Sequence, residues 1–332
     1  MQSKPNMHAL PIIDISAFIK GDSARKQSIA GQAHDAVRDY GFFYLSQHGL
    51  NTVIEDCFAA AQWFFYQETE EKQKIHIDKS PCHRGWYAFG GETLDPHHNP
   101  EGDYKEGLKI GNDLPATHAF VQNNIPLHGP NQWPSAMDQE SLNFRQVMET
   151  AHQEFSKLAN HIVHILALSL ELPENYFDAF FKTPMTTLSP IFYPPQKQAE
   201  TQWNIGAGAH TDFGMLSILA QDGTAGLEIN HQNNWLSIPP ITDMLVVNIG
   251  DMLDFWTQGY YRSTMHRVQN QAETARQSLV FFYDPQYDTK LAPITSPKLP
   301  VTHQASHDKQ NVQTALDHLL KKIEASFFND EK

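Results

Sequence analysis

Two histidines and one aspartate carry most of the chemical information in this chain of 332 residues. His210 and Asp212 stand two residues apart in the segment Ala-His-Thr-Asp-Phe-Gly, and His266 follows in the segment Met-His-Arg-Val. On an extended strand, residues two apart project to the same face, so His210 and Asp212 can converge on one ion. Two imidazoles and one carboxylate form the ligand set that holds a non-haem Fe(II) and leaves coordination positions open. The pattern therefore predicts an oxygen-activating iron site.

A cation and a hydroxyl stand shortly after His266. Arg276 and Ser278 are two residues apart, so on a strand both side chains face the same side. A guanidinium and a hydroxyl in this arrangement can grip one terminal carboxylate with charge-assisted hydrogen bonds. The apolar run from Leu279 to Tyr283 indicates a buried strand, where a charge needs a partner. The pair therefore predicts an anchor for a dicarboxylate co-substrate.

Composition narrows the class of protein. The chain has 38 acidic residues against 24 Lys and Arg, a net charge of −14, whereas nucleic-acid binders usually carry excess positive charge. The two cysteines, Cys57 and Cys82, argue against a disulfide framework and favour a reducing compartment. The N-terminal residues lack a signal-peptide core, and no run approaches the ~20 apolar residues of a membrane span. We expect a cytoplasmic protein that acts on a small molecule and binds neither nucleic acid nor membrane.

Residues 1–135 are predicted to form a helical N-terminal part of a single catalytic unit that spans residues 1–332. Strands are expected at 10–15 and 42–45, and helices at 23–40 and about 53–67. The segment 79–134 is rich in Gly, Pro, His and Asn and shows little periodicity. Long irregular segments inside compact chains are usually functional loops, so we expect this one to contact the substrate.

Three further parts complete the predicted unit. Residues 136–175 should hold one long support helix, because apolar residues recur at helical spacing between 147 and 166. Over 186–290, short β-prone runs are broken by Gly, Asn-Asn and Pro-Pro, which is typical of a sandwich or jelly roll. A final amphipathic helix is expected at 310–328. The predicted fold class is α+β with a mainly β core, a distorted double-stranded β-helix (jelly roll) wrapped by helices.

Seven segments between residues 10 and 285 carry a resemblance to a known family. They are Leu10–Ile15, Gly41–Leu45 with His48 and Gly49, Tyr193–Pro195, His210–Asp212, Val247–Met252, Ser263–Val268 and Arg276–Ser278. On these segments the chain resembles the Fe(II)- and 2-oxoglutarate-dependent oxygenases of the isopenicillin N synthase-like superfamily. The resemblance implies a jelly-roll core and Fe(II) ligation by His210, Asp212 and His266.

The same resemblance implies a co-substrate. Arg276 and Ser278 would bind the far carboxylate of 2-oxoglutarate, and Tyr193 is similar to a tyrosine that contacts the same carboxylate. O2 would be the oxidant, ascorbate an accessory reductant, and succinate and CO2 the co-products. The family's C-terminal helix, which often covers the mouth of the site, would correspond to 312–327. One departure is the segment 196–200, which lacks the Cys-Pro continuation of many plant members and so weakens the transfer of a plant-metabolite substrate.

The substrate is not encoded in these motifs. Candidate lining residues are Arg84, Trp86, Tyr87, Phe213, Phe282 and Tyr283. The aromatic side chains among them serve equally well as core packing. Arg84 supplies one fixed cation in a segment poor in cations, which favours a small carboxylated metabolite. Its neighbour His83 is interpreted as a loop residue.

Two other functions share the same ligand pattern. One is an oxidase or ring-closing enzyme of the same superfamily that works without 2-oxoglutarate, since such members can keep the Arg276 and Ser278 pair. The other is a metal-binding jelly roll without turnover. Within the main interpretation, hydroxylation is the expected outcome, and desaturation or cyclisation are the alternatives. The oligomeric state is not indicated.

Overall fold

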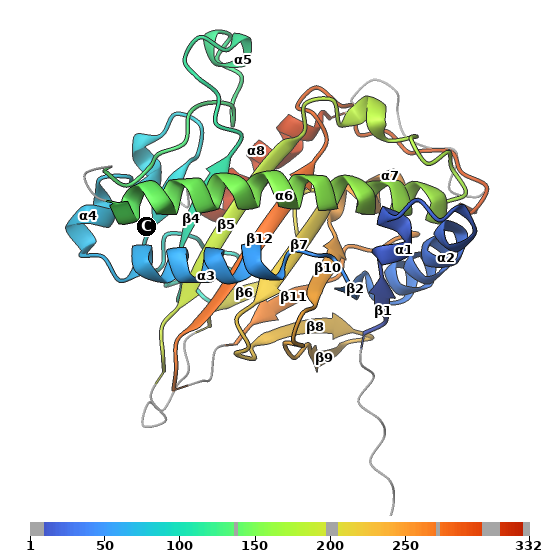
Figure 1. Cartoon of the computed structure of the whole chain (residues 1–332), viewed down its shortest axis with the longest axis horizontal. Helices are drawn as coiled ribbons and strands as arrows, with labels where there is room; N and C mark the ends of the chain where they lie inside the picture. The colour runs from blue at the N-terminus through green and yellow to red at the C-terminus, as the bar shows by residue number, and fades with distance from the viewer. Residues whose placement is uncertain (1–9, 136–138, 197–204, 270–272, 301–312, 328–332) are drawn as a thin grey trace, which may run out of the picture.

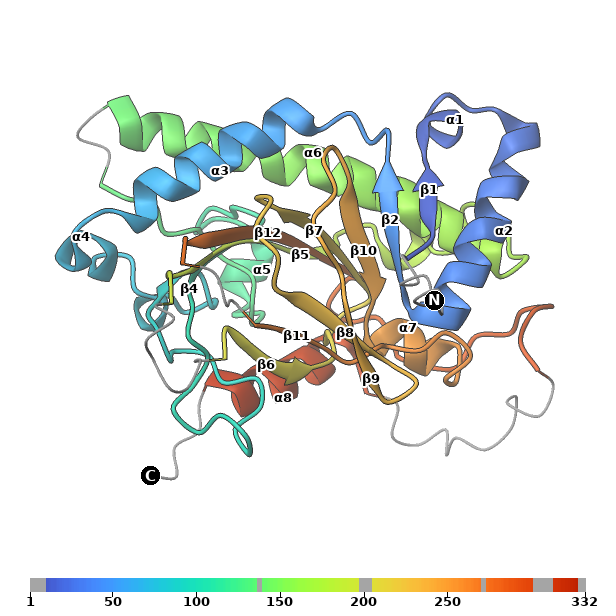
Figure 2. The same cartoon turned by 90° about the horizontal axis from the view of Figure 1, so that it is seen from below.

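Two sheets that pack face to face form the middle of the molecule. The computed structural model describes residues 10–135, 139–196, 205–269, 273–300 and 313–327. The larger sheet contains, in spatial order, β1 (Ile12–Asp14), β2 (Phe42–Ser46), β10 (Leu245–Ile249), β7 (Leu216–Gln221), β12 (Arg276–Asp284), β5 (Met185–Tyr193), β4 (Glu106–Gly111) and β3 (Gly85–Tyr87). The smaller sheet contains β6 (Ala207–His210), β11 (His266–Val268), β8 (Leu227–His231) and β9 (Asn234–Ser237). Figure 2 shows the smaller sheet beneath the larger one.

Helices cover the outer face of the larger sheet. The α-helices are α1 (Ser16–Ile19), α2 (Ser23–Tyr40), α3 (Asn51–Phe65), α4 (Thr69–Gln73), α5 (Ala119–Gln122), α6 (Gln139–Ser169), α7 (Asp251–Trp256) and α8 (Ala315–Phe327), and 3₁₀ turns occupy Ile77–Lys79 and Asp178–Phe180. Helices α3 and α6 run side by side across that face (Figure 1), while α8 lies on the opposite side, near the smaller sheet (Figure 2). Among the described residues, no helix combines the length and apolar character needed to cross a bilayer.

Residues at the two ends of α2 explain where the helix begins and why β2 follows it. The carboxylate of Asp22 accepts the backbone N–H groups of Ala24 and Arg25, which caps the start of the helix. Gly41 ends the helix with a φ of +70°, a left-handed conformation that glycine adopts without steric cost. Because the helix stops there, Phe42 begins a buried strand, and its ring contacts the imidazole of His266.

Strand β12 divides its side chains between two environments. Leu279, Phe281 and Tyr283 face the helices, where Phe281 packs on Phe155 of α6. The alternate residues, from Arg276 to Asp284, face the space between the sheets. Because both faces are covered, the middle of the strand, Leu279–Tyr283, is a continuous apolar run.

The sandwich of two sheets confirms the predicted jelly-roll fold with helices around a β core. The long helix is α6 and the C-terminal helix is α8; residues 136–138, 310–312 and 328 of the predicted ranges lie outside the described residues. The segment 79–134 differs from the prediction, because it contributes β3 and β4 to the larger sheet. Strand β4 reads Glu-Gly-Leu-Lys-Ile-Gly, and its charges and glycines hide the strand alternation.

Candidate active site

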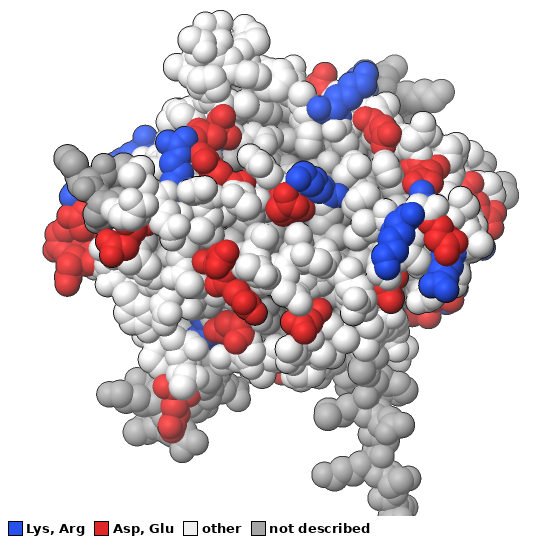
Figure 3. Space-filling model, in the orientation of Figure 1, with Lys and Arg blue, Asp and Glu red and all other residues white. Residues whose placement is uncertain are grey.

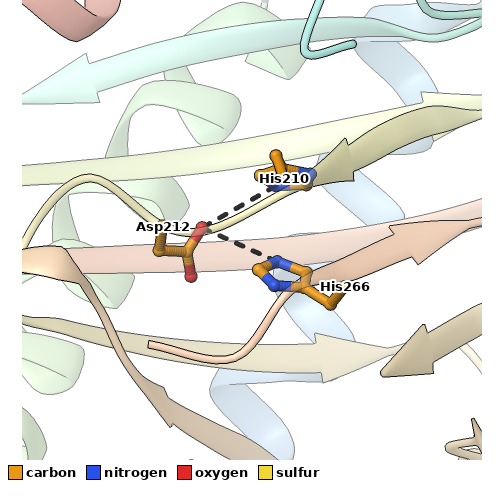
Figure 4. Close-up of side chains that lie close together, drawn as sticks. All are labelled: His210, Asp212 and His266. Atoms are coloured by element: carbon orange, nitrogen blue, oxygen red, sulfur yellow. Dashed lines mark ion pairs between the residues drawn. The ribbon is translucent and has the colours of Figure 1, made fainter. Parts of the chain in front are cut away.

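The three predicted metal ligands converge at one end of the smaller sheet. His266 on β11 pairs directly with His210 at the end of β6, and Asp212 follows two residues later. The Oδ1 atom of Asp212 lies 3.9 Å from Nε2 of His210 and 3.7 Å from Nε2 of His266 (Figure 4). One ligand atom from each residue falls within 4.8 Å of the others. This arrangement fits a single ion held by three side chains.

Backbone carbonyls orient both imidazoles. Nδ1 of His210 lies 2.7 Å from the carbonyl oxygen of Gly208, and Nδ1 of His266 lies 3.1 Å from that of Thr264. A carbonyl only accepts, so each Nδ1 carries the proton and each Nε2 keeps a free lone pair. This is the outer hydrogen bonding that metal-ligating histidines require.

The two oxygens of the Asp212 carboxylate have different partners. Oδ2 accepts hydrogen bonds from Oγ of Ser217 at 2.5 Å and from Nδ2 of Asn248 at 2.6 Å, which leaves Oδ1 facing the imidazoles. Burial acts to raise the pKa of Asp212, but the two histidines and these hydrogen bonds outweigh it and lower the pKa. Burial and the neighbouring His266 lower the pKa of His210 to about 3. A carboxylate beside a neutral imidazole is the state in which metal ligands bind.

Arg276 provides a fit for the co-substrate. Its side chain is fully buried; Nε donates to the carbonyl oxygen of Thr224 at 3.3 Å and Nη2 to Oε1 of Gln221 at 3.2 Å. Nη1 has no hydrogen-bond partner among the described residues. Tyr193 pairs with Arg276 across the sheet, and its ring lies 4.7 Å from the guanidinium carbon. A buried cation with a spare donor, beside the buried Ser278, matches the carboxylate that the sequence predicts there.

A single cavity of about 170 Å³ joins these groups. It lies between the two sheets, and its walls include the three metal ligands together with Tyr193, Arg276 and Ser278. Three predicted substrate residues, Arg84, Phe213 and Phe282, also line it. The structure therefore brings the metal, co-substrate and substrate candidates to the wall of one cavity.

Tyr87 is the first of three predicted lining residues that the structure places elsewhere. It is not among the residues lining the cavity; its buried ring covers Gly107 of β4 and contacts Phe327 edge-on. Its neighbour Trp86 faces the other side of the sheet and donates to Glu106 at 2.6 Å. Tyr283 likewise packs on Phe181, away from the cavity. The aromatic candidates thus divide between cavity wall and core.

Several cavity residues carried no signal in the sequence. Lys109 on β4 and Lys105, just before that strand, line the cavity. Glu92 and Asp284 line it as well. Burial raises the pKa of Asp284 to about 7, although its carboxylate accepts the backbone N–H of Met215. Alternation along β4 would have found the two lysines, had the strand been recognised. His83 lies in a loop before β3, as predicted, and it also lines the cavity.

Helix α8 closes one wall of the cavity. Leu319, Ile323 and Phe327 stand at helical spacing and line the cavity. Backbone hydrogen bonds and two side chains of the helix hold it in place. Nε2 of His318 lies 2.9 Å from the carbonyl oxygen of Phe213, and Lys322 forms a 2.8 Å ion pair with Asp251.

Comparisons with known proteins identify the family. Residues 10–136 match the family model described as "non-haem dioxygenase in morphine synthesis N-terminal", and residues 175–285 match "2OG-Fe(II) oxygenase superfamily". A 2-oxoglutarate-Fe(II) type oxidoreductase of Aspergillus fumigatus is 32% identical over 82% of this chain and 81% of its own length. Clavatol oxidase of Penicillium crustosum is 30% identical over 98% of both chains. A Neurospora crassa protein, solved with alpha-KG and thymine, has a TM-score of 0.82 at 24% identity and covers 97% of this chain and 98% of its own.

The chain therefore belongs to the 2-oxoglutarate- and Fe(II)-dependent oxygenase superfamily. It is an oxidoreductase, a dioxygenase that uses Fe(II), 2-oxoglutarate and O2. The predicted family, fold class and cofactors are confirmed.

Proposed function

We propose that this protein hydroxylates a small organic substrate and couples the reaction to the oxidative decarboxylation of 2-oxoglutarate to succinate and CO2. In this proposal His210, Asp212 and His266 ligate iron. Arg276, Ser278 and Tyr193 bind the far carboxylate of 2-oxoglutarate. The observation that carries the proposal is that three converging ligand atoms share one cavity with the unpartnered Nη1 of the buried Arg276.

Each of these residues has a distinct physical task. Iron, when bound with its co-substrate, supplies the activation of O2, and the protein supplies position and exclusion of water. The carbonyls of Gly208 and Thr264 hold the histidines in one tautomer. Asn248 fixes the free oxygen of Asp212 toward them. The fork geometry of Arg276 then sets the orientation of the dicarboxylate with respect to the three ligands.

The substrate is proposed to occupy the part of the cavity lined by Arg84, Phe213 and Phe282. A cavity of about 170 Å³ between two sheets suits a small molecule. On the face drawn in Figure 3, the described Lys and Arg side chains lie singly or beside acidic ones, and nucleic acid is not proposed as a partner. A cytoplasmic location is proposed because Cys57 and Cys82 are free and buried.

The test is an aerobic incubation of the purified protein with Fe(II), ascorbate and 2-oxoglutarate, followed by an assay for succinate. Adding a metabolite extract in fractions should identify fractions that stimulate succinate release, and mass spectrometry should then find a product that is 16 Da heavier. Oxygen uptake that is indifferent to 2-oxoglutarate would instead favour the oxidase that works without it. Tight iron binding without any oxygen uptake would favour a non-catalytic role.

A further inference from the structure

The cavity contains four cationic side chains, and they differ in what neutralises them. Arg276 is assigned to the co-substrate. Lys105 is paired twice, with Glu92 at 2.7 Å and with Asp103 at 2.9 Å. The remaining two, Arg84 and Lys109, are less well paired. The chain as a whole is acidic, so positive charge inside this cavity is a local feature.

Arg84 is a buried cation with no ion pair among the described residues. Its side chain donates to two backbone carbonyls, from Nη2 to Leu127 at 2.8 Å and from Nη1 to His83 at 3.3 Å. Its Nε atom is buried and has no partner in the described part of the chain. The residue is 5% exposed, and the carboxylate of Asp113 acts on its charge only from beyond ion-pair distance. Burying an unpaired charge is costly, which points to a ligand that supplies the anion.

Lys109 is the second under-paired cation. Its ammonium has one carboxylate neighbour, Glu92 at 3.4 Å, and that carboxylate is held more closely by Lys105. The rings of Tyr87 and Phe327 lie 5.4 and 5.7 Å from Nζ and shield it from solvent. An ammonium carries three donors, so Lys109 retains donors for a molecule in the cavity.

Strand β4 places these two cations on one patch of the wall. Lys109 and Gly111 are two residues apart and share a face of the strand. The guanidinium of Arg84 lies directly over Gly111, where a Cβ atom would overlap it, so the glycine makes room for the cation. His83 is within electrostatic reach of both. Its burial, then Lys109 and Arg84, lower the pKa of His83 to about 3, so its ring adds no charge.

This patch is separate from the co-substrate anchor. Gly111 pairs with Thr187, and Thr187 pairs with Phe282, so Arg84 lies at the level of Phe282. Phe282 is six residues along β12 from Arg276, which corresponds to roughly 20 Å at about 3.3 Å per residue. One small dicarboxylate cannot span that distance. Arg84 and Arg276 therefore serve two different anions.

The acidic groups of the cavity leave this charge uncancelled. Asp212 is directed toward the metal, and Glu92 is shared between two lysines. Asp284 is the remaining acid on this wall, and burial raises its pKa to about 7, so its negative charge is partial near neutrality. A bound anion would neutralise the remaining positive charge of Arg84 and Lys109.

We propose that the primary substrate is an organic anion, a carboxylate, whose charged group binds between Arg84 and Lys109. We name these two residues the substrate-anion site. The apolar body of the molecule lies against Phe282, Leu319 and Phe327, which line the same cavity. This inference rests on the proposed function, because it names the substrate class of the same active site.

Equilibrium binding tests the proposal without turnover. The protein, loaded with Fe(II) and 2-oxoglutarate under anaerobic conditions, is titrated with benzoate, phenylacetate and hexanoate, and with the corresponding neutral amides. Calorimetry and the shift in melting temperature are the readouts. We expect at least one acid to bind ten times more tightly than its amide.

Variants separate the site from general effects. Lys109→Met should weaken binding of that acid at least tenfold and leave the amide unchanged, and Arg84→Lys should weaken it to a smaller degree because an ammonium lacks the guanidinium fork. Lys157→Met is the matched control, since Lys157 is exposed and pairs with Glu154 on α6. Affinity for 2-oxoglutarate should stay within twofold in all three variants.

Three results would overturn the inference: no acid in the panel binds, amides bind as well as acids, or Lys109→Met keeps the full preference for the acid. Failure of the proposed function has a different signature. In that case the unmodified protein would bind no 2-oxoglutarate and release no succinate. Normal binding of 2-oxoglutarate with no preference for acids would refute only the substrate-anion site.

Discussion

At the scale of single residues, the metal site depends on hydrogen bonds that leave one atom of each ligand free. The histidines donate from Nδ1 to backbone carbonyls, and Oδ2 of Asp212 accepts hydrogen bonds from Ser217 and Asn248. Only Nε2 of each imidazole and Oδ1 of the carboxylate remain available. The facial geometry is therefore set by the protein before any metal binds.

Replacement of one ligand should remove the metal and spare the fold. In His266→Ala we expect iron content below a tenth of that of the unmodified protein, because two ligands hold Fe(II) poorly and no fourth acidic or imidazole group joins the cluster among the described residues. The melting temperature without metal should change by only a few degrees. Metal analysis and calorimetry give both numbers. His97→Ala, at an exposed loop histidine, is the control. A His266→Ala protein with full iron content would refute the ligand assignment.

The co-substrate anchor gives a second prediction at this scale. Removing one partner of a desolvated charge pair costs about 2–5 kcal/mol, so Arg276→Ala should raise the 2-oxoglutarate midpoint about 30-fold or more. Arg276→Lys should recover part of the loss. Succinate formation across a 2-oxoglutarate titration measures the midpoint, and iron content is checked separately. The exposed Arg145→Ala is the control. An unchanged midpoint in Arg276→Ala would place the anchor elsewhere and favour the oxidase that works without 2-oxoglutarate.

At the scale of elements, periodicity decided what the sequence could predict. Helix α2 and strand β2 start at the residues that the pattern indicates, because apolar spacing and Gly41 mark them. Strands β3 and β4 were not predicted from the sequence, because β3 is an edge strand of three residues and the cavity face of β4 holds a lysine and glycines in place of apolar residues. The substrate-anion site takes Lys109 from β4 and Arg84 from the residue just before β3. It therefore could not be assembled from the sequence, although Arg84 could be singled out.

The contact between α6 and β5 predicts a dependence of stability on pH. Burial, and then the charge of Arg84, lower the pKa of His152 to about 4, and its Nε2 lies 2.9 Å from Oγ1 of Thr186. In the unfolded chain this histidine takes up its proton near pH 6.5, so the unfolded state binds more protons as the pH falls below that value. The contribution of His152 to the free energy of unfolding is fully present above pH 6.5, and it is lost as the pH falls from 6.5 toward 4.

This group should account for about 2 kcal/mol of the stability lost between pH 7.5 and pH 5. Denaturant unfolding of the unmodified protein and of His152→Gln at the two pH values measures the effect. We expect the difference between the two pH values to shrink by that amount in the variant, whatever its stability at pH 7.5. His97→Gln, at an exposed site, should keep the full difference. An equal pH dependence in His152→Gln would show that another group is responsible.

At the scale of the whole molecule, the active site lies in a layer between two sheets and is closed by the last helix. The larger sheet supplies Arg276 and the substrate-anion site, and the smaller sheet supplies both histidines. Helix α8 lies on the side of the molecule opposite α3 and α6, and Figure 2 shows it near the smaller sheet. Residues from the whole length of the chain thus meet around one cavity. Sequence motifs predicted the residues of the cavity wall around the iron and the co-substrate. The wall formed by Leu319, Ile323 and Phe327 depends on how α8 packs against the sheets.

Loosening α8 should open the cavity without disturbing the metal site. Ile323→Asp replaces a half-buried apolar side chain on the face of α8 that lines the cavity by a carboxylate, and moving a charge out of water costs several kcal/mol, about enough to loosen the helix. We expect backbone amides of residues 315–327 to exchange with solvent at least tenfold faster, and binding of the preferred acid to weaken, while iron content stays unchanged. Hydrogen exchange followed by mass spectrometry measures the first effect. Ala325→Asp, at an exposed position on the same helix, introduces the same charge and should leave both properties as they are. If Ile323→Asp exchanged no faster than Ala325→Asp, the helix would be held by its polar contacts to Phe213 and Asp251, and the apolar face would not be what closes the cavity.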